Sequence, residues 1–131
     1  MAGIFSRIIS GEIPAHKIAE NEYCFAFLDV KPLVKGHTLV VPKQEIDYLF
    51  DIPEDLYNEL FSFAKVVAKA IHQSIPCIKV GMSVIGLEVP HAHIHLVPMN
   101  SMQDLNFSNP RLVLSPEEYK EIATAISSKL S

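Results

Sequence analysis

The chain has 131 residues, of which 49% are hydrophobic and 20% charged, a composition typical of one globular domain and unlike that of a disordered chain. Its formal net charge of −4 argues against a general nucleic-acid-binding surface, although a pocket on an acidic protein can still bind a phosphorylated ligand. The sequence shows no signal-peptide pattern and no apolar stretch of membrane-spanning length, so we expect a cytoplasmic protein with no nucleic-acid and no membrane partner.

The first half of the chain predicts a short helix followed by three strands. Residues 5–9 form an apolar helical turn that Gly11 ends. The stretch 17–29 predicts two strands joined by a turn at 20–22, and the second strand is rich in aromatic residues. A third strand follows over 37–41. These elements are typical of a half-buried sheet.

The second half predicts helices and two more strands. A long amphipathic helix begins near 51–53 and carries apolar residues at helical spacing, namely Leu56, Leu60, Phe63, Val67 and Ile71. Strands are predicted over 78–84 and 92–97. Ser115 caps a last helix and forms a capping box with Glu118. We therefore expect an α+β fold, a mostly antiparallel sheet with one long helix packed on it and a C-terminal helix.

The most informative segment is 90–98, where three of the six histidines alternate as His91, His93 and His95. On a strand, alternate side chains share a face, so these imidazoles point one way and the apolar residues between them point toward the core. The row is open to three interpretations: a solvated strand face, a metal site, or a reactive imidazole with supporting neighbours. The chemistry favours the last, because a neutral imidazole can attack phosphorus.

The same segment resembles the His-x-His-x-His-x-x-Pro signature of the histidine-triad (HIT) family. Residues 4–14, 25–32 and 36–43 resemble, in the family's order, its N-terminal helix and nucleoside-binding strands. The resemblance covers about residues 4–100 and is closest to the Hint-like branch. It implies a HIT-like fold in a single HIT domain over 1–131, with a core of about 4–100 and a C-terminal extension with a helix over about 101–131.

The resemblance also implies an enzyme. Hint-like proteins are usually homodimers that act at the α-phosphate of nucleoside 5′-phosphoramidates and related nucleotides, so we expect a purine nucleotide as the small-molecule partner and no cofactor. His93 matches the histidine that becomes transiently nucleotidylated. His91 matches the residue that orients His93 or helps to carry its proton, and His95 the one that donates to the α-phosphate.

Further positions match the family's nucleotide-binding residues. Asp29 matches the acid that accepts hydrogen bonds from the ribose hydroxyls, although an aspartate before Lys31 also suits a turn. The positions that enclose the base are matched by apolar residues that are equally ordinary core residues, namely Phe5, Ile8, Phe27, Val30 and Leu39. We expect His37 to hold the backbone or a neighbouring loop.

At two places the sequence departs from the family pattern, so the roles of the family's residues there cannot be assigned to this chain. Many members hold zinc through a Cys-x-x-Cys pair, a further His and a triad His, but this chain has Gly3, Ser6 and Glu45 at the first three positions, so we expect no metal. Its two cysteines lie far apart, outside any CxxC spacing.

The second departure lies just before the triad. The segment 83–90 is shorter than the family's pattern, with Ser83 near an Asn position, Leu87 in place of Gln, and Glu88 where a hydroxyl would donate to phosphate. An ionised carboxylate cannot donate, so Glu88 points away, pairs with a triad histidine, or acts on the leaving group. The alternatives to the phosphoramidase are a nucleotide-binding module with weak catalysis, a dinucleoside polyphosphate hydrolase, and a metal-binding protein.

Overall fold

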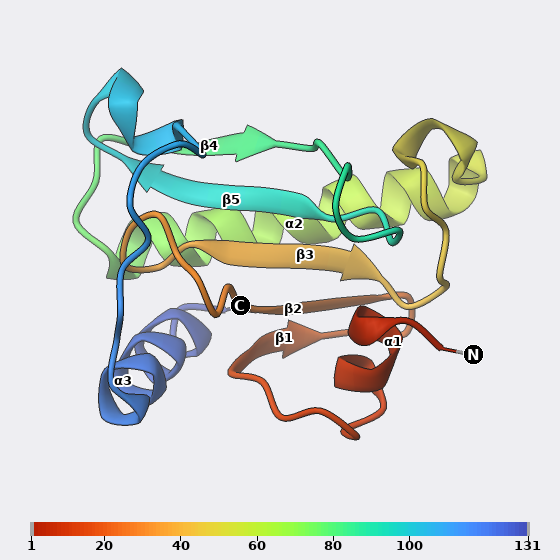
Figure 1. Ribbon diagram of the computed structural model, residues 1–131, viewed down its shortest axis with the longest axis horizontal. Coiled ribbons are helices and arrows are strands. Elements are labelled where there is room, and N and C mark those ends of the chain that lie inside the picture. Colours follow the sequence, from red (N-terminus) through yellow and green to blue (C-terminus); the bar gives the residue numbers. More distant parts are fainter. Residues whose placement is uncertain (1, 131) are drawn as a thin grey trace.

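The computed structural model describes residues 2–130 and contains one five-stranded sheet. The strands are β1 (Lys17–Glu20), β2 (Cys24–Leu28), β3 (Thr38–Pro42), β4 (Lys79–Ser83) and β5 (Ile94–Met99). They lie in the order β1-β2-β3-β5-β4, and every neighbouring pair is antiparallel (Figure 1). The predicted α+β class with a mostly antiparallel sheet is therefore confirmed.

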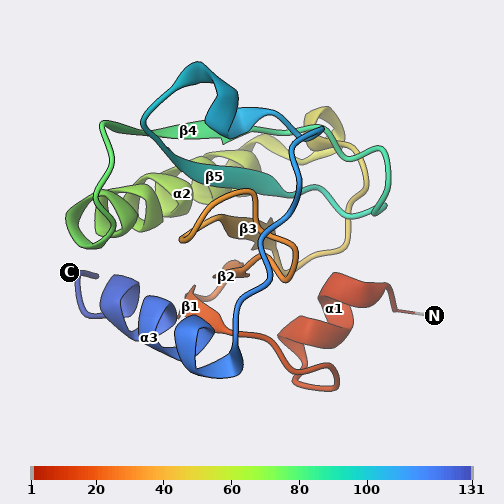
Figure 2. The same cartoon turned by 60° about the vertical axis from the view of Figure 1, so that its left-hand side comes forward.

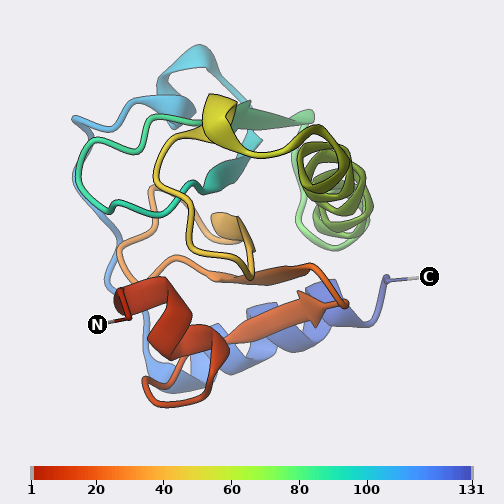
Figure 3. The ribbon, with the colours of Figure 1, turned by 90° about the vertical axis from the view of Figure 1, so that its right-hand side faces the viewer.

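Helices cover the two faces of the sheet unequally. The long helix α2 (Glu54–Ser74) and the C-terminal helix α3 (Pro116–Ser127) lie against one face, and the short helix α1 (Ile4–Ile9) lies on the other (Figure 3). We call these the α2 face and the α1 face. On α2, the predicted apolar stripe faces inward, because Leu60, Val67 and Ile71 are completely buried.

Alternation along the strands sorts residues between the two faces. Ala26 and Leu28 of β2 join the core under α2, whereas Phe25 and Phe27 join a second apolar cluster that contains Phe5 of α1. All five residues of β2 and of β3 are buried, because both faces of these central strands are covered.

The strand that follows the first triad histidines begins later than predicted. We expected a strand over 92–97, but β5 runs from Ile94 to Met99, so His91 and His93 precede it. The physical reason is that the N–H of Ala92 bonds to the carbonyl of Ile46, 2.7 Å away in the loop after β3, instead of to a neighbouring strand. The predicted alternation still holds, since Ala92, Ile94 and Leu96 lie in the core under α2.

The C-terminal helix begins as predicted. The hydroxyl of Ser115 accepts from the N–H of Glu118 at 3.1 Å, and the Glu118 carboxylate accepts from the N–H of Ser115 at 3.1 Å. Two short 3-10 helices, η1 (Leu49–Asp51) and η2 (Met102–Leu105), were not predicted. Within residues 2–130, no helix has both the length and the apolar character needed to cross a bilayer.

Candidate active site

A cleft of about 510 Å³ opens on the α1 face. It lies between α1, the loop that precedes β5, the turn after β2, and the segment that leads to α3, and Figure 2 shows these elements around the same face. Its lining is Ile4, Phe5, Asp29, Val30, Lys31, Ile85, Gly86, Leu87, Glu88, Val89, His93, His95, Phe107 and Arg111. Two of the three triad histidines therefore line the cleft.

A backbone contact determines the tautomer of the neutral His93 ring. Its Nδ1 lies 2.7 Å from the carbonyl oxygen of His91, which can only accept, so Nδ1 carries the hydrogen. The lone pair of the neutral ring is therefore on Nε2. The ring is 7% exposed and packs edge-on against Phe5, with 5.0 Å between ring centroids. Nε2 is consequently the nitrogen available to a ligand.

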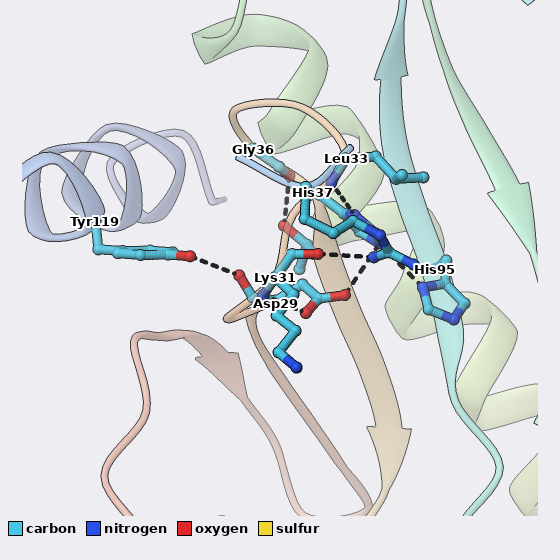
Figure 4. Close-up of polar contacts among 9 residues, drawn as sticks. Asp29, Lys31, Leu33, Gly36, His37, His95 and Tyr119 are labelled. Carbon is cyan, nitrogen blue, oxygen red and sulfur yellow. Dashed lines mark hydrogen bonds and ion pairs between the residues drawn. The ribbon is translucent and has the colours of Figure 1, made fainter. Parts of the chain in front are cut away.

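His95 is oriented by a histidine outside the triad, His37 (Figure 4). The N–H of Leu33 donates to His37 Nδ1 at 3.0 Å, so the hydrogen of His37 lies on Nε2. This Nε2 is 3.0 Å from His95 Nδ1, which must then accept. His95 is left with its own hydrogen on Nε2, as a hydrogen-bond donor in the cleft.

Burial favours the neutral forms of His37, His91 and His95, and the hydrogen bond between His37 and His95 requires neutral rings. Burial, and after it the positive charge of Arg111, lowers the pKa of His37 from 6.5 to about 4. Burial, and after it the neighbouring His93 and His37, lowers the pKa of His95 from 6.5 to about 3. Burial also lowers the pKa of His91. Deep placement in the fold thus keeps the rings uncharged.

The backbone before His37 has a conformation that only glycine adopts without strain. Gly36 has φ +94°, and a Cβ added there would lie 3.1 Å from side-chain carbons of Ile75 and Pro98. Its carbonyl also accepts from the hydroxyl of Thr38 at 2.8 Å. Gly36 therefore sets the direction in which His37 leaves the chain.

Asp29, His37 and His95 bring three potential metal ligands together, with one atom of each within 4.8 Å of the others. A metal on His37 Nε2 would place the hydrogen of the neutral ring on Nδ1, where it would face the Leu33 N–H that now donates to it. The carboxylate of Asp29 lies 3.5 Å from His37 Nε2 and accepts from the N–H of Lys31 at 2.9 Å. The cluster therefore fits a hydrogen-bond chain better than a metal site.

Comparison with known proteins decides the family. Residues 10–102 match the sequence model of the HIT domain. Over 132 aligned positions, which cover 99% of each chain, the sequence is 33% identical to adenosine 5′-monophosphoramidase hnt1 of Schizosaccharomyces pombe. The chain belongs to the HIT family.

Solved structures of HIT proteins share its fold. The HIT-like protein of Bartonella henselae matches with a TM-score of 0.84 at 25% identity, over 98% of this chain and 96% of that one. A zinc-bound histidine triad protein of Mycobacterium smegmatis also gives a TM-score of 0.84, at 27% identity, over 99% of this chain and 94% of that one. The HIT-like fold predicted from the sequence is confirmed.

The first histidine of this HIT triad contacts His93 through its backbone. The ring of His91 is 1% exposed, and its Nε2 donates to the carbonyl of Pro42 at 2.8 Å. This leaves the lone pair of His91 Nδ1 buried without a hydrogen-bond partner among residues 2–130. His91 therefore orients His93 by its carbonyl oxygen, while its ring fastens the segment to the end of β3.

Only some of the other predicted nucleotide-binding residues line the cleft. Phe5, Asp29, Val30 and Glu88 line the cleft. The remaining predictions lie outside the lining: Ile8, Phe27 and Leu39 belong to the apolar cluster beneath Phe5, and Ser83 pairs with His95 across β4 and β5.

Several cleft residues of this HIT domain were missed in the sequence. Lys31, Phe107 and Arg111 line it, and the ring of Phe107 packs against His95 with 4.8 Å between centroids. Phe107 and Arg111 belong to a stretch that matches no family pattern, so no motif marked them. His37 was expected to hold a loop, and its contact with Leu33 does so, but its contact with His95 was not foreseen.

The residues at the family's zinc positions meet in this fold but do not suit zinc. Glu45 Oε1 accepts from the N–H of Gly3 at 2.8 Å and from the hydroxyl of Ser6 at 2.7 Å. These hydrogen bonds lower the pKa of Glu45, the bond from Ser6 most strongly. The cluster offers a carboxylate, a hydroxyl and an amide where zinc prefers thiolates and imidazoles, so we derive no step through a metal. Instead, Glu45 ties α1 to the loop after β3.

Proposed function

We propose that this HIT protein hydrolyses purine nucleoside 5′-phosphoramidates or related nucleotides at the α-phosphate, through a nucleotidyl intermediate on His93. The observation that carries the proposal is the 2.7 Å contact between His93 Nδ1 and the carbonyl of His91, because it leaves the Nε2 lone pair for the cleft. The names of similar proteins support the substrate class: adenosine 5′-monophosphoramidases of Schizosaccharomyces pombe and Saccharomyces cerevisiae are 33% and 38% identical to this chain over the aligned residues.

The reaction proceeds in two displacements at phosphorus. The Nε2 lone pair of His93 forms a bond to the α-phosphorus while the bond from phosphorus to the leaving nitrogen breaks. The leaving amine keeps that electron pair and takes up one proton. Water then attacks phosphorus, the bond to His93 breaks, and one proton is released with the nucleoside monophosphate. His95 donates its Nε2 hydrogen to a phosphate oxygen, which stabilises the charge that develops in each step.

The rest of the cleft holds the nucleoside. Asp29 uses one oxygen for the N–H of Lys31, and a carboxylate has further lone pairs for the ribose hydroxyls. Phe5 and Val30 supply an apolar wall for the base, and Val30 is 66% exposed at the cleft. Ile8, Phe27 and Leu39 contribute indirectly, because they pack in the same apolar cluster as Phe5 and support its ring.

The test replaces the nucleophile and follows both turnover and the adduct. His93→Ala should abolish steady-state turnover of adenosine 5′-phosphoramidate and the nucleotidyl adduct seen by mass spectrometry after an acid quench. His72→Ala is the matched control, since His72 is an exposed histidine at the end of α2. Turnover by His93→Ala at the rate of the control would refute the proposal.

A nucleotide-binding module with little catalysis is the second candidate, and the loop before the triad favours it. Leu87 is 89% exposed and Glu88 is exposed, so this loop offers a carboxylate and an apolar side chain instead of donors for phosphate. Calorimetry with adenosine monophosphate beside a single-turnover assay separates the candidates. Binding without any adduct would favour the module.

We also propose that the protein is a cytoplasmic homodimer. Strand β4 is an edge of the sheet, and Ile78 and Met82 beside this edge are 66% and 44% exposed, which suits pairing with a second copy. Both cysteines are free, and burial raises the pKa of Cys24 to about 11, so this thiol is inert in a reducing compartment. Light scattering that reports a monomer at micromolar concentration would contradict the dimer.

A further inference from the structure

The segment between η2 and α3 crosses the α1 face (Figure 2). Its residues Phe107 and Arg111 line the cleft. Two hydrogen bonds fasten it to the turn after β2: the N–H of Leu112 donates to the carbonyl of Pro32 at 2.9 Å, and Nη1 of Arg111 donates to the carbonyl of Lys31 at 2.7 Å. This attachment brings Phe107 and Arg111 beside the triad, although neither belongs to the matched HIT region of 10–102.

The guanidinium of Arg111 is held in place but keeps most of its donors. It lies 5.5 Å from the ring centroid of Phe107, which in turn packs on His95 at 4.8 Å. A guanidinium has five N–H donors, and among residues 2–130 this one makes a single hydrogen bond, to the carbonyl of Lys31. Within residues 2–130, none of the ion pairs includes Arg111. Arg111 is thus an exposed cation at the cleft, held by its contacts with Lys31 and Phe107, and no carboxylate of the described residues pairs with it.

The two acidic residues of the cleft do not form an ion pair with Arg111. Asp29 directs one oxygen to the N–H of Lys31 and the other toward His37 Nε2 at 3.5 Å. Glu88, the other acid of the lining, is exposed on the loop before β5. The charge of Arg111 does reach His95 of the triad and its neighbour His37, since it contributes to the lowered pKa of both. An anionic group of a ligand is the natural partner for such a cation.

We propose that Arg111, with Lys31 beside it, forms a second anion subsite that selects nucleotides carrying a further phosphate besides the α-phosphate. The inference rests on the proposed nucleotide hydrolase and names the class of substrate that it prefers. His93 and His95 bind the α-phosphate, whereas the further phosphate contacts the guanidinium of Arg111, which lies over the ring of Phe107. A planar guanidinium binds phosphate through two N–H groups at once, which Lys cannot do.

The further phosphate has two possible positions, and the experiment distinguishes them. Three substrates are compared: adenosine 5′-phosphoramidate, which has one phosphate; a diadenosine polyphosphate, with further phosphates on the leaving-group side; and 3′-phosphoadenosine 5′-phosphoramidate, with a further phosphate on the ribose. The measured quantity is the ratio of kcat/KM for each polyanionic substrate to kcat/KM for the simple phosphoramidate. A general loss of activity in a variant lowers both kcat/KM values equally, so it does not change their ratio.

Arg111→Gln should lower one of the two ratios about tenfold, and the ratio that falls identifies the position of the further phosphate. Arg111→Lys should restore part of that loss, because it keeps the charge but not the paired donors. The matched control is Lys120→Gln, which removes one positive charge from the exposed side of α3. The subsite would be overturned if both kcat/KM ratios of Arg111→Gln stay within twofold of wild type. It would also be overturned if the ratios fall equally in Lys120→Gln.

A wild-type protein that turns over none of the three substrates would refute the proposed hydrolase and still leave the subsite testable. Calorimetry then compares adenosine monophosphate with adenosine diphosphate and adenosine 3′,5′-bisphosphate, using wild type and Arg111→Gln. The subsite predicts that one bisphosphorylated ligand binds wild type more tightly than adenosine monophosphate and loses this advantage in Arg111→Gln. Equal affinities for all three ligands in wild type would reject it.

Discussion

His37 Nε2 and His95 Nδ1 lie 3.0 Å apart, although the two residues are 58 positions apart in the chain. Since the N–H of Leu33 occupies the other nitrogen of His37, a backbone amide in a turn determines which nitrogen of His95 carries a hydrogen. The chain of contacts runs from a loop, through a completely buried ring, to a ring that lines the cleft. We therefore expect His37 to be a positioning residue, because it fixes the nitrogen of His95 that carries a hydrogen into the cleft.

Replacing His37 tests this positioning role. His37→Leu removes the donor to His95 Nδ1, so His95 is free to place its hydrogen on the wrong nitrogen, and kcat should fall about 100-fold, as for the loss of one donor to the transition state. His37→Gln keeps an amide donor and should lose less. Imidazole ¹⁵N shifts report the tautomer directly. Equal losses in both variants with an unchanged His95 tautomer would contradict the role.

The buried histidines predict a loss of stability in mild acid. The folded-state pKa of His37 is about 4 and that of an unfolded histidine is 6.5, so the unfolded state binds more protons below pH 6.5. The contribution of neutral His37 to stability is complete above pH 6.5 and falls as the pH drops toward 4. Between pH 7.5 and 5.5 we expect the free energy of unfolding to fall by about 1 kcal/mol on this account.

Urea unfolding at the two pH values measures this loss. His37→Gln, which cannot titrate, is the control and should show a smaller pH dependence. A wild-type midpoint that stays constant or rises on acidification would argue against a neutral, buried His37.

The carboxylate of Glu45 should hold α1 in place. Glu45→Ala removes the acceptor for Gly3 and Ser6, so amide hydrogen exchange across α1 should rise about tenfold, and KM should rise because Phe5 loses its fixed position. Glu45→Gln keeps an acceptor oxygen and should stay close to wild type. If exchange in Glu45→Ala matches that of wild type, the attachment of α1 depends on other contacts.

The capping box of α3 offers a prediction on stability alone. Ser115→Ala removes the acceptor for the N–H of Glu118 and should lower the free energy of unfolding by about 1 kcal/mol, with an unchanged urea m-value. Ser128→Ala, at the other end of the same helix, is the control, because its hydroxyl donates within the last turn, to the carbonyl of Ala125 at 2.7 Å. A larger loss of stability in Ser128→Ala than in Ser115→Ala would contradict the stabilising role of the capping box.

Local patterns explain how much of the fold the sequence predicts. The apolar spacing of α2, the capping box at Ser115 and the alternation through Ala92, Ile94 and Leu96 each involve residues within one or two turns or along one strand. Such patterns depend on short-range geometry, which the order of residues determines. The alternation of the triad histidines is also a local pattern, and two of the residues that it marks, His93 and His95, line the cleft.

The rest of the site depends on contacts between distant segments. Arg111 reaches the cleft because it bonds to Lys31, 80 positions earlier, and no periodicity in 100–114 indicates that attachment. His37 reaches His95 across two neighbouring strands, β3 and β5, whose pairing the sequence does not specify. The late start of β5 has the same cause, since Ala92 bonds to Ile46 in another loop.

Gly36 carries no functional group, yet its backbone conformation decides where His37 lies. An inherited or engineered replacement of this glycine would leave every reactive group of the enzyme present and would still misdirect the ring that sets the hydrogen of His95. A search for damaging variants that scores only reactive side chains would pass over this position. Any redesign of the turn after β2 must therefore preserve a residue that contributes its backbone and the absence of a side chain.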